Sequence, residues 1–154
     1  MEPPTRLRAK ILVVDDEPVL RGQIRETLAA LGHTIIEAGS GSEALRLAEA
    51  ERPDLVLVDL MLPDVTGIEV CQRLRASPVT RDCRIIVVSG MQVRSALEES
   101  IIAGADDFLA KPIDAVELTV RVRSMLRVRN IHDDERRVEA YIQQIRSLRP
   151  PTAE

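Results

Sequence analysis

Three aspartates stand at the ends of two apolar stretches, where an unpaired charge is costly to bury. Asp59 follows the run at residues 55–58, and Asp15 and Asp16 follow the run "KILVV" at residues 10–14. Burying an unpaired carboxylate costs several kcal/mol or forces its neutralisation. Each acid therefore either caps a helix or receives positive charge from another group.

The two acidic stretches come together if the first and third strands are neighbours in a parallel sheet. Ligands of open α/β sheets bind beyond the carboxyl ends of the strands, so Asp15, Asp16 and Asp59 would share one crevice. Two carboxylates about 4 Å apart repel by ~4 kcal/mol at an effective dielectric of about 20, so three of them need a cation. Taken singly, each acid is more simply a helix cap or a turn residue. Their joint occurrence, as an all-oxygen donor set, predicts Mg²⁺, for which Mn²⁺ can substitute.

Two further strand ends carry groups that suit an anionic tetrahedral ligand. "RIIVVSG" ends in Ser89-Gly90, which offers a hydroxyl and an unobstructed backbone N–H, and "DDFLAKP" ends in Lys111-Pro112, which offers an ammonium. Each pair is ordinary alone, because Ser-Gly is a common turn and Lys usually lies at the surface. Together with a metal, these groups would stabilise phosphoryl oxygens.

Five short apolar runs alternate with helical patterns and must position these side chains. The runs span residues 10–14, 33–38, 54–58, 84–88 and 106–110. The first, third and fourth are continuously aliphatic, as strands covered on both faces are, whereas the second and fifth are more polar and suit sheet edges. Helical spacing between the runs includes a possible capping box at Ser40 and Glu43, a stripe at Val93, Leu97 and Ile101, and a cap at Asp114. The sequence predicts an α/β fold, a doubly wound, flavodoxin-like (βα)5 sheet with five parallel strands in the order 2-1-3-4-5.

The 154 residues are enough for one domain with a short extension. We expect a flexible tail over 1–8, the α/β domain over 9–127, a helical or coiled-coil extension or linker over 128–149, and a tail over 150–154. Five apolar residues of the extension fall at heptad spacing: Ile131, Val138, Tyr141, Ile145 and Leu148. This spacing predicts that the segment continues the fifth helix as a coiled coil or signalling helix.

Composition excludes several classes of protein. The net charge of −4 argues against a general binder of nucleic acid or membrane surfaces. No apolar run approaches the roughly 18 residues of a membrane span. The two cysteines, Cys71 and Cys83, are too few for a disulfide framework and favour two small buried side chains in a reducing cytoplasm. We therefore expect a cytoplasmic protein with an aliphatic core.

The chain from about residue 9 to residue 127 resembles the receiver domain of two-component response regulators, in the CheY-like superfamily. The resemblance rests on "VVDDEP", "LVLVDLMLPDVTG", "VVSG" and "GADDFLAKP", which occur in the family's order and spacing. It implies that Asp59 is the phosphoacceptor and that Asp15 and Asp16 hold Mg²⁺. It also implies that Asp16, Asp59 and the carbonyl of Met61 ligate the metal directly.

The same resemblance assigns roles to the other strand ends. Ser89 and Lys111 would contact the phosphoryl group, and the peptide bond between Lys111 and Pro112 would be cis. Ser89 would move toward the phosphoryl group, and Phe108 would rotate inward to fill the space that it leaves. The simpler interpretation of this single phenylalanine is a core residue.

The resemblance implies a signalling domain that takes a phosphoryl group from a histidine kinase or histidine phosphotransfer protein and is not an enzyme toward other substrates. Val116, Arg121 and the acidic residues Asp106 and Asp107 suit the fourth-helix, fifth-strand and fifth-helix face through which many receivers dimerise. A solvated charged surface is the alternative, and the C-terminal helix is a second possible route to a homodimer. We expect no direct contact with nucleic acid or membrane.

Three other interpretations stay open from the sequence. The chain could be part of a longer regulator whose output domain, for example a cyclic-dinucleotide enzyme, lies beyond it. An aspartyl-phosphate phosphohydrolase of the haloacid dehalogenase type uses similar groups, but its nucleophile follows the first strand, whereas Asp59 follows the third. A binding module that keeps the fold without phosphorylation would not need Asp59, Lys111 and Ser89.

Overall fold

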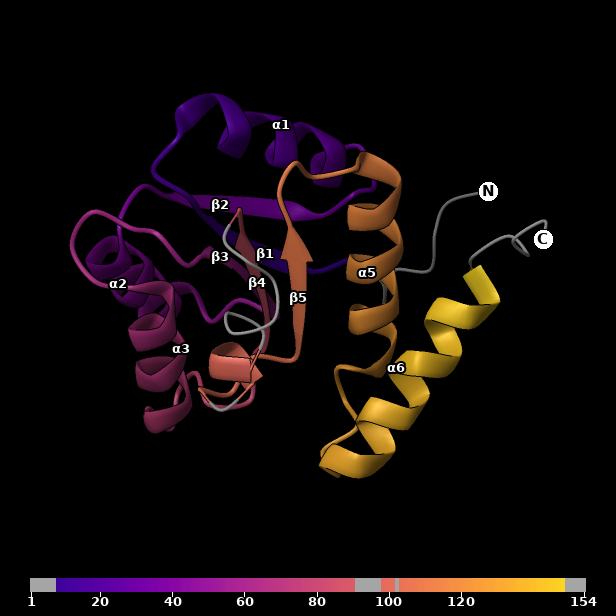
Figure 1. Ribbon diagram of the computed structural model, residues 1–154. Coiled ribbons are helices and arrows are strands. Elements are labelled where there is room, and N and C mark those ends of the chain that lie inside the picture. The colour runs from indigo at the N-terminus through magenta and orange to yellow at the C-terminus, as the bar shows by residue number, and fades with distance from the viewer. Residues whose placement is uncertain (1–7, 91–97, 102, 149–154) are drawn as a thin grey trace.

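The strands of the chain form one parallel sheet with helices on both faces (Figure 1). The computed structural model describes residues 8–90, 98–101 and 103–148. The strands are β1 (Lys10–Val14), β2 (Thr34–Ala38), β3 (Leu55–Asp59), β4 (Arg84–Ser89) and β5 (Asp107–Ala110). Their order is β2-β1-β3-β4-β5 and every neighbouring pair is parallel, which confirms the predicted doubly wound sheet.

Helices cover the sheet in two layers, with α1 and α5 on one side and α2 and α3 on the other (Figure 1). Their bounds are α1 (Pro18–Ala29), α2 (Gly41–Glu51), α3 (Gly67–Ala76), α5 (Ala115–Val128) and α6 (Asp134–Leu148). A helical turn at 98–101 precedes β5. The predicted stripe residues Val93 and Leu97 lie outside the described residues, as do residues 1–7 and 150–154 of the predicted tails and residue 149 of the predicted extension.

The core consists of two aliphatic clusters, one on each face of the sheet, because successive strand residues point to opposite faces. On β1, Leu12 and Val14 join the cluster under α2 and α3, whereas Ile11 and Val13 join the cluster under α1 and α5. The central strand β3 is buried along its whole length. This explains why the first, third and fourth apolar runs are continuous rather than alternating.

Side-chain caps fix where the helices begin. The hydroxyl of Ser40 accepts a hydrogen bond from the Glu43 N–H at 3.2 Å, and the carboxylate of Asp114 accepts one from the Val116 N–H at 2.9 Å. Both predicted caps are therefore present. The carboxylate of Asp64, which is distant in the sequence, also caps α2. It accepts hydrogen bonds from the Gly41 N–H and the Ser42 N–H at 2.8 and 2.9 Å.

The expectation that the fifth helix continues through the C-terminal segment is wrong. Helix α5 ends at Val128, and α6 begins at Asp134 and folds back beside α5 (Figure 1). The carboxylate of Asp133 accepts a hydrogen bond from the Arg136 N–H at 3.0 Å, which supports a new helix start. Tyr141 is buried and Ile145 is partly buried in the α1/α5 cluster of the same chain. The heptad pattern therefore reflects packing within one molecule.

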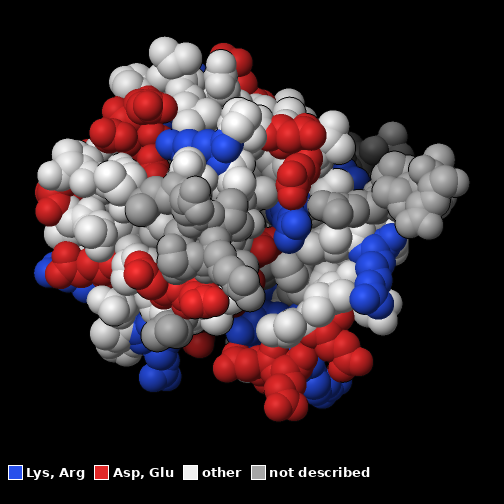
Figure 2. All heavy atoms as spheres, in the orientation of Figure 1, with Lys and Arg blue, Asp and Glu red and all other residues white. Residues whose placement is uncertain are grey.

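No helix in the described part of the chain is both long enough and apolar enough to cross a bilayer. The acidic and basic side chains in Figure 2 are interspersed over the face that it shows. Cys71 and Cys83 are both buried and unpaired, and burial raises the pKa of the Cys71 thiol to about 12. These two cysteines are therefore packing residues, as predicted.

Candidate functional site

Three carboxylates converge at the carboxyl ends of β1 and β3. Strands β1 and β3 are neighbours, with Val14 paired to Val58, so the residues that follow each strand meet. Asp15, Asp16 and Asp59 each present an oxygen within 4.8 Å of the others. Asp15 and Asp59 are buried, whereas Asp16 is exposed. The structure thus brings together the three acids that the sequence singled out.

The carboxylate of Asp59 is held by one donor on each oxygen. The Met61 N–H donates to Oδ1 at 3.0 Å, and the Lys111 ammonium donates to Oδ2 at 2.8 Å. Asp59 is 4% exposed, so these donors replace water that burial has removed. The contact from Met61 lays the loop backbone against the carboxylate. The role of the Met61 carbonyl as a metal ligand remains a prediction.

Lys111 joins the cluster from the end of β5. Its Nζ lies 2.8 Å from Asp59 Oδ2 and 3.2 Å from Asp15 Oδ2. Burial by itself lowers the pKa of Lys111, but the hydrogen bond that Lys111 donates to Asp59 and the charges of Asp59 and Asp15 outweigh this effect. The net result is a pKa above the ordinary lysine value. Lys111 is therefore charged at neutral pH and offsets part of the acidic cluster.

The charges and free oxygens of this cluster fit a divalent cation. Three carboxylates against one ammonium leave two formal negative charges. The oxygen Oδ2 of Asp15 is buried and accepts no hydrogen bond from the described residues, although it forms the ion pair with Lys111. Oxygen donors of this kind suit Mg²⁺ or Mn²⁺. Asp15, Asp16 and Asp59 are the residues that could hold such an ion.

Ser89 and Lys111 lie at the same edge of the sheet as the acids. Ser89 is the last residue of β4 and is fully buried, and its carbonyl accepts a hydrogen bond from the Lys111 N–H at 2.9 Å. A side chain at the next residue, Gly90, would place its Cβ 3.8 Å from the Lys111 Cβ. The end of β4 therefore lies against Lys111. Contact between the Ser89 hydroxyl and a phosphoryl group remains a prediction.

Two residues near Lys111 in the sequence are Phe108, within β5, and Pro112, which follows Lys111 directly. The Lys111–Pro112 peptide bond is cis. Phe108 pairs with Val87 of β4, is 8% exposed and packs in the cluster under α2 and α3. Its core position is thus established, and its rotation on phosphorylation stays a prediction.

Gly67 is a positioning residue whose role was not predicted from the sequence. It opens α3, and a Cβ at this position would lie 2.4 Å from the Asp59 carbonyl oxygen and 2.8 Å from the Leu60 Cα. Its N–H donates to the Leu60 carbonyl at 3.0 Å. Only a residue without a side chain allows α3 to start this close to the nucleophile candidate. The glycine at the end of "LPDVTG" is the sequence signal for it.

Comparison with known proteins agrees with this geometry. A family model described as the response regulator receiver domain matches residues 11–123. Response regulator MprA of Mycobacterium ulcerans (strain Agy99) is 38% identical over 129 residues, which cover 84% of this chain and 55% of that protein. Response regulator PleD of Caulobacter vibrioides (strain NA1000 / CB15N) is 36% identical over 134 residues, which cover 87% of this chain and 30% of that protein. The chain thus spans about half of the first relative and less than a third of the second.

A solved structure gives the same answer for the fold. The response regulator receiver domain protein (CheY-like) from Methanospirillum hungatei JF-1 superposes with a TM-score of 0.75 at 26% identity. The match covers 79% of this chain and 96% of that one. Sequence match, sheet order and the convergence of Asp15, Asp16, Asp59 and Lys111 lead to one conclusion. The chain belongs to the receiver domain family of two-component response regulators.

Proposed function

We propose that Asp59 is the phosphoacceptor of a two-component signalling pathway. The observation that carries this proposal is the position of Asp59, a buried carboxylate at the end of β3. Its two oxygens bind Lys111 and the Met61 N–H, and Asp15 and Asp16 lie beside it. A carboxylate that was only a helix cap would not need two further acids and an ammonium around it. This arrangement supports covalent capture of a phosphoryl group.

The reaction that fits these groups is in-line transfer from a phosphohistidine. A carboxylate oxygen of Asp59 forms a bond to phosphorus, and the bond between phosphorus and the histidine nitrogen of the donor breaks. The electron pair of that bond leaves with the imidazole nitrogen. Lys111 and the Ser89 hydroxyl would bind the phosphoryl oxygens. Attack of water on the phosphorus of the acyl phosphate then releases phosphate and restores Asp59.

The acidic cluster would hold Mg²⁺ during this reaction, through Asp15, Asp16 and Asp59. When bound, the ion supplies positive charge to the carboxylates and to the oxygens of the transferred group. The contribution of the chain is to keep the Asp59 carboxylate in one orientation. The hydrogen bonds from Met61 and Lys111 do so, because they fix both of its oxygens.

The partner implied by this chemistry is a histidine kinase or a histidine phosphotransfer protein, which would bring the donor to the exposed edge of the site. The chain would catalyse its own phosphorylation and dephosphorylation and would act on no other substrate. We place this chemistry in the cytoplasm, in line with the two buried, unpaired cysteines. Association with a second copy through β5 and α5 is the output that the resemblance suggests.

Incubation with acetyl phosphate and Mg²⁺ tests the proposal. We expect a mass gain of one phosphoryl group in the wild-type chain and none in Asp59→Asn. A matched control is Asp54→Asn, because Asp54 directly precedes β3 and so lies beyond the end of the strand opposite to Asp59. That variant should still gain the phosphoryl group. A wild-type chain that gains no mass from acetyl phosphate or any phosphohistidine donor would remove the basis for the proposal.

A further inference from the structure

Helix α6 covers the face formed by β5 and α5. It folds back from the end of α5 and lies beside that helix (Figure 1). Two side chains of α6, Arg137 and Tyr141, reach the two aspartates at the start of β5, Asp106 and Asp107. We call these four residues the α6 clasp. The clasp occupies part of the surface through which the proposed function would act.

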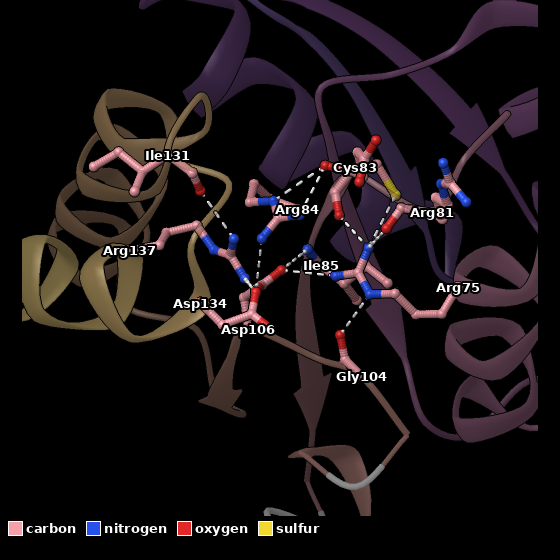
Figure 3. Close-up of polar contacts among 11 residues, drawn as sticks. Arg75, Arg81, Cys83, Arg84, Ile85, Gly104, Asp106, Ile131, Asp134 and Arg137 are labelled. Atoms are coloured by element: carbon pink, nitrogen blue, oxygen red, sulfur yellow. Dashed lines mark hydrogen bonds and ion pairs between the residues drawn. The ribbon is translucent and has the colours of Figure 1, made fainter. Parts of the chain in front are cut away.

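The first half of the clasp is centred on Asp106. Three guanidinium groups point at its carboxylate, from Arg75 of α3, Arg84 of β4 and Arg137 of α6 (Figure 3). The distances are 2.9, 3.1 and 3.6 Å. Arg137 also donates to the carbonyl of Ile131 at 3.0 Å, which ties α6 to the segment that leads into it. Asp106 therefore links α6 to the body of the domain.

The second half of the clasp is centred on Asp107. The hydroxyl of Tyr141 donates a hydrogen bond to Asp107 Oδ2, and Arg121 of α5 donates to the same oxygen at 2.8 Å. Tyr141 is 7% exposed. Burial and the charge of Asp107 raise the pKa of Tyr141 well above its ordinary value. The phenol is thus held between α6, β5 and α5.

Helix α6 does not pack closely against the domain on the side that faces residues 98–101. A cavity of about 690 Å³ opens there, lined in part by Asp106, Arg137 and Val138. Val138 of α6 and Ile101 are among its lining residues and are 55% and 58% exposed. Apolar side chains of α6 and of the turn at 98–101 are therefore exposed to water at this cavity.

The clasp and the candidate phosphorylation site share one short strand. Asp106 directly precedes β5 and Asp107 is its first residue, and Lys111, which binds Asp59, follows its end. A shift of β5 toward a modified Asp59 would move both aspartates relative to α6. Strand β5 therefore connects the Asp59 site directly to the α6 clasp.

We propose that α6 keeps the chain monomeric by covering a self-association surface on β5 and α5, and that a second copy of the chain competes with α6 for this surface. The surface carries acid and base side by side, Asp107 next to Arg121 and Glu117. A two-fold interface faces each patch with its own copy, so a patch that contains both signs of charge complements itself. Release of α6 would also uncover the apolar surface under Tyr141 and Ile145, which a second copy would cover.

The role of the clasp can be tested without any phosphoryl donor. In the full chain, the double variant Arg137→Gln and Tyr141→Phe removes the charge and the hydroxyl but keeps the aromatic ring in the core. We expect at least a tenfold gain in the dimerisation constant over the wild type by sedimentation. The control is Arg136→Gln, the same substitution on the adjacent, exposed residue, which should behave as the wild type. Tyr141→Phe alone is the fallback if the double variant does not fold, with a smaller gain in the same direction.

Hydrogen exchange of the α6 amides makes each outcome decisive. The proposal expects that the double variant loses protection in α6 and gains dimer. A variant that loses protection but stays monomeric would show that the uncovered face does not self-associate. Retained protection would show that the clasp does not hold α6, and dimerisation of Arg136→Gln would show that the association is unspecific. Each of these three results overturns the proposal.

The link to phosphorylation, which rests on the proposed function, has its own measurement. Tyr141 is the single tyrosine of the chain and there is no tryptophan, so the ultraviolet absorbance of phenolate reports on α6 alone. A raised pKa of Tyr141 means that docking is favoured below pH 10 and weakens as the pH rises through the docked value. We expect beryllofluoride with Mg²⁺ to move the titration of wild-type Tyr141 toward pH 10, and to leave the titration of Asp59→Asn unchanged.

The outcomes separate this link from the proposed function. If the proposed chemistry of Asp59 is wrong, beryllofluoride leaves the Tyr141 titration unchanged while the double variant still dimerises. If beryllofluoride modifies Asp59 but the Tyr141 titration does not change, the proposed link between Asp59 and α6 is wrong.

Discussion

At the scale of single residues, the negative charge of the site is only partly neutralised by the chain itself. Lys111 lies between Asp15 and Asp59 and neutralises one of three negative charges. The remaining charge of the cluster is what makes a divalent cation the fitting ligand. Asp16 differs from the other two acids because it is exposed, so it can give its full charge to an ion without a burial cost.

Asp16→Asn tests this assignment. Because Asp16 is exposed, the free energy of unfolding without metal should change by no more than about 0.5 kcal/mol. The affinity for Mg²⁺ should fall at least about tenfold, which is about 1.4 kcal/mol of lost stabilisation at a saturating concentration of the ion. Thermal unfolding at several Mg²⁺ concentrations measures both quantities.

The control for that substitution is Glu17→Gln. Glu17 is the next acid in the chain and is exposed, but it is not in the cluster of oxygens. Its Mg²⁺ response should match that of the wild type. An equal loss in both variants would mean that Mg²⁺ responds to general negative charge rather than to a site.

At the scale of elements, loops and helix starts decide where the reactive groups lie. Helix α3 begins at Gly67 directly against the Asp59 carbonyl, and the carboxylate of Asp64 in the same loop caps α2. Hydrogen bonds hold the capping Asp64 in its charged form, and they lower its pKa. The loop after β3 is therefore fixed at both ends by contacts that a strand-and-helix pattern does not reveal.

Gly67→Ala should disturb this loop. Its new Cβ would lie 2.4 Å from the Asp59 carbonyl oxygen, so backbone must move. Overpacking of this kind costs about 1–3 kcal/mol in free energy of unfolding. We also expect slower phosphorylation by acetyl phosphate, measured by mass against time, because Asp59 shifts with its backbone.

Gly22→Ala is the matched control for the same change. Gly22 lies inside α1 with no atom within 4 Å of the new Cβ. Alanine is favoured over glycine within a helix by about 1 kcal/mol, so this variant should be more stable than the wild type. Opposite signs in the two variants are the expected result, and equal signs would contradict the steric argument.

At the scale of the whole molecule, Asp106 joins parts that are far apart in the sequence. It binds Arg75 of α3, Arg84 of β4 and Arg137 of α6, and also accepts the Ile85 N–H at 2.8 Å. Burial lowers the pKa of Arg84, and the charge of Asp106 counteracts this. The packing of α3, β4 and α6 at this end of the sheet therefore depends on a single carboxylate.

Asp106→Asn should be strongly destabilising. The side chain of Arg84 is 6% exposed and that of Asp106 is 12% exposed, so the variant leaves a buried positive charge without its carboxylate partner. Loss of one partner of a buried ion pair costs about 3 kcal/mol or more, and added salt should recover little of it. Urea unfolding at low and high salt measures both effects.

The control is Asp82→Asn in the same part of the molecule. Asp82 contacts Arg84 through its backbone carbonyl, at 3.2 and 2.8 Å, which the substitution preserves. Its stability should stay within about 0.5 kcal/mol of the wild type. A large loss in Asp82→Asn would mean that general charge in this region, rather than the carboxylate of Asp106, holds the elements together.

The sequence by itself determined the sheet and the cluster of acids. Apolar runs of strand length that alternate with helical spacing leave little choice of fold, because each run must be covered on both faces. Since parallel strands end at a common edge, Asp15, Asp16, Asp59 and Lys111 were expected to meet there. The strands and helices could be predicted because their burial and periodicity depend on residues that are close together in the sequence.

Only the tertiary structure decided where the last helix lies. The heptad spacing of Ile131, Tyr141 and Ile145 fits a coiled coil as well as it fits packing on α5, because both bury one face of a helix. The choice depended on partners distant in sequence, Asp106 and Asp107, which α6 reaches once the chain has folded back. The close approach of Gly67 to Asp59 was likewise invisible until α3 was set against β3, since a steric contact exists only between elements that are already in place.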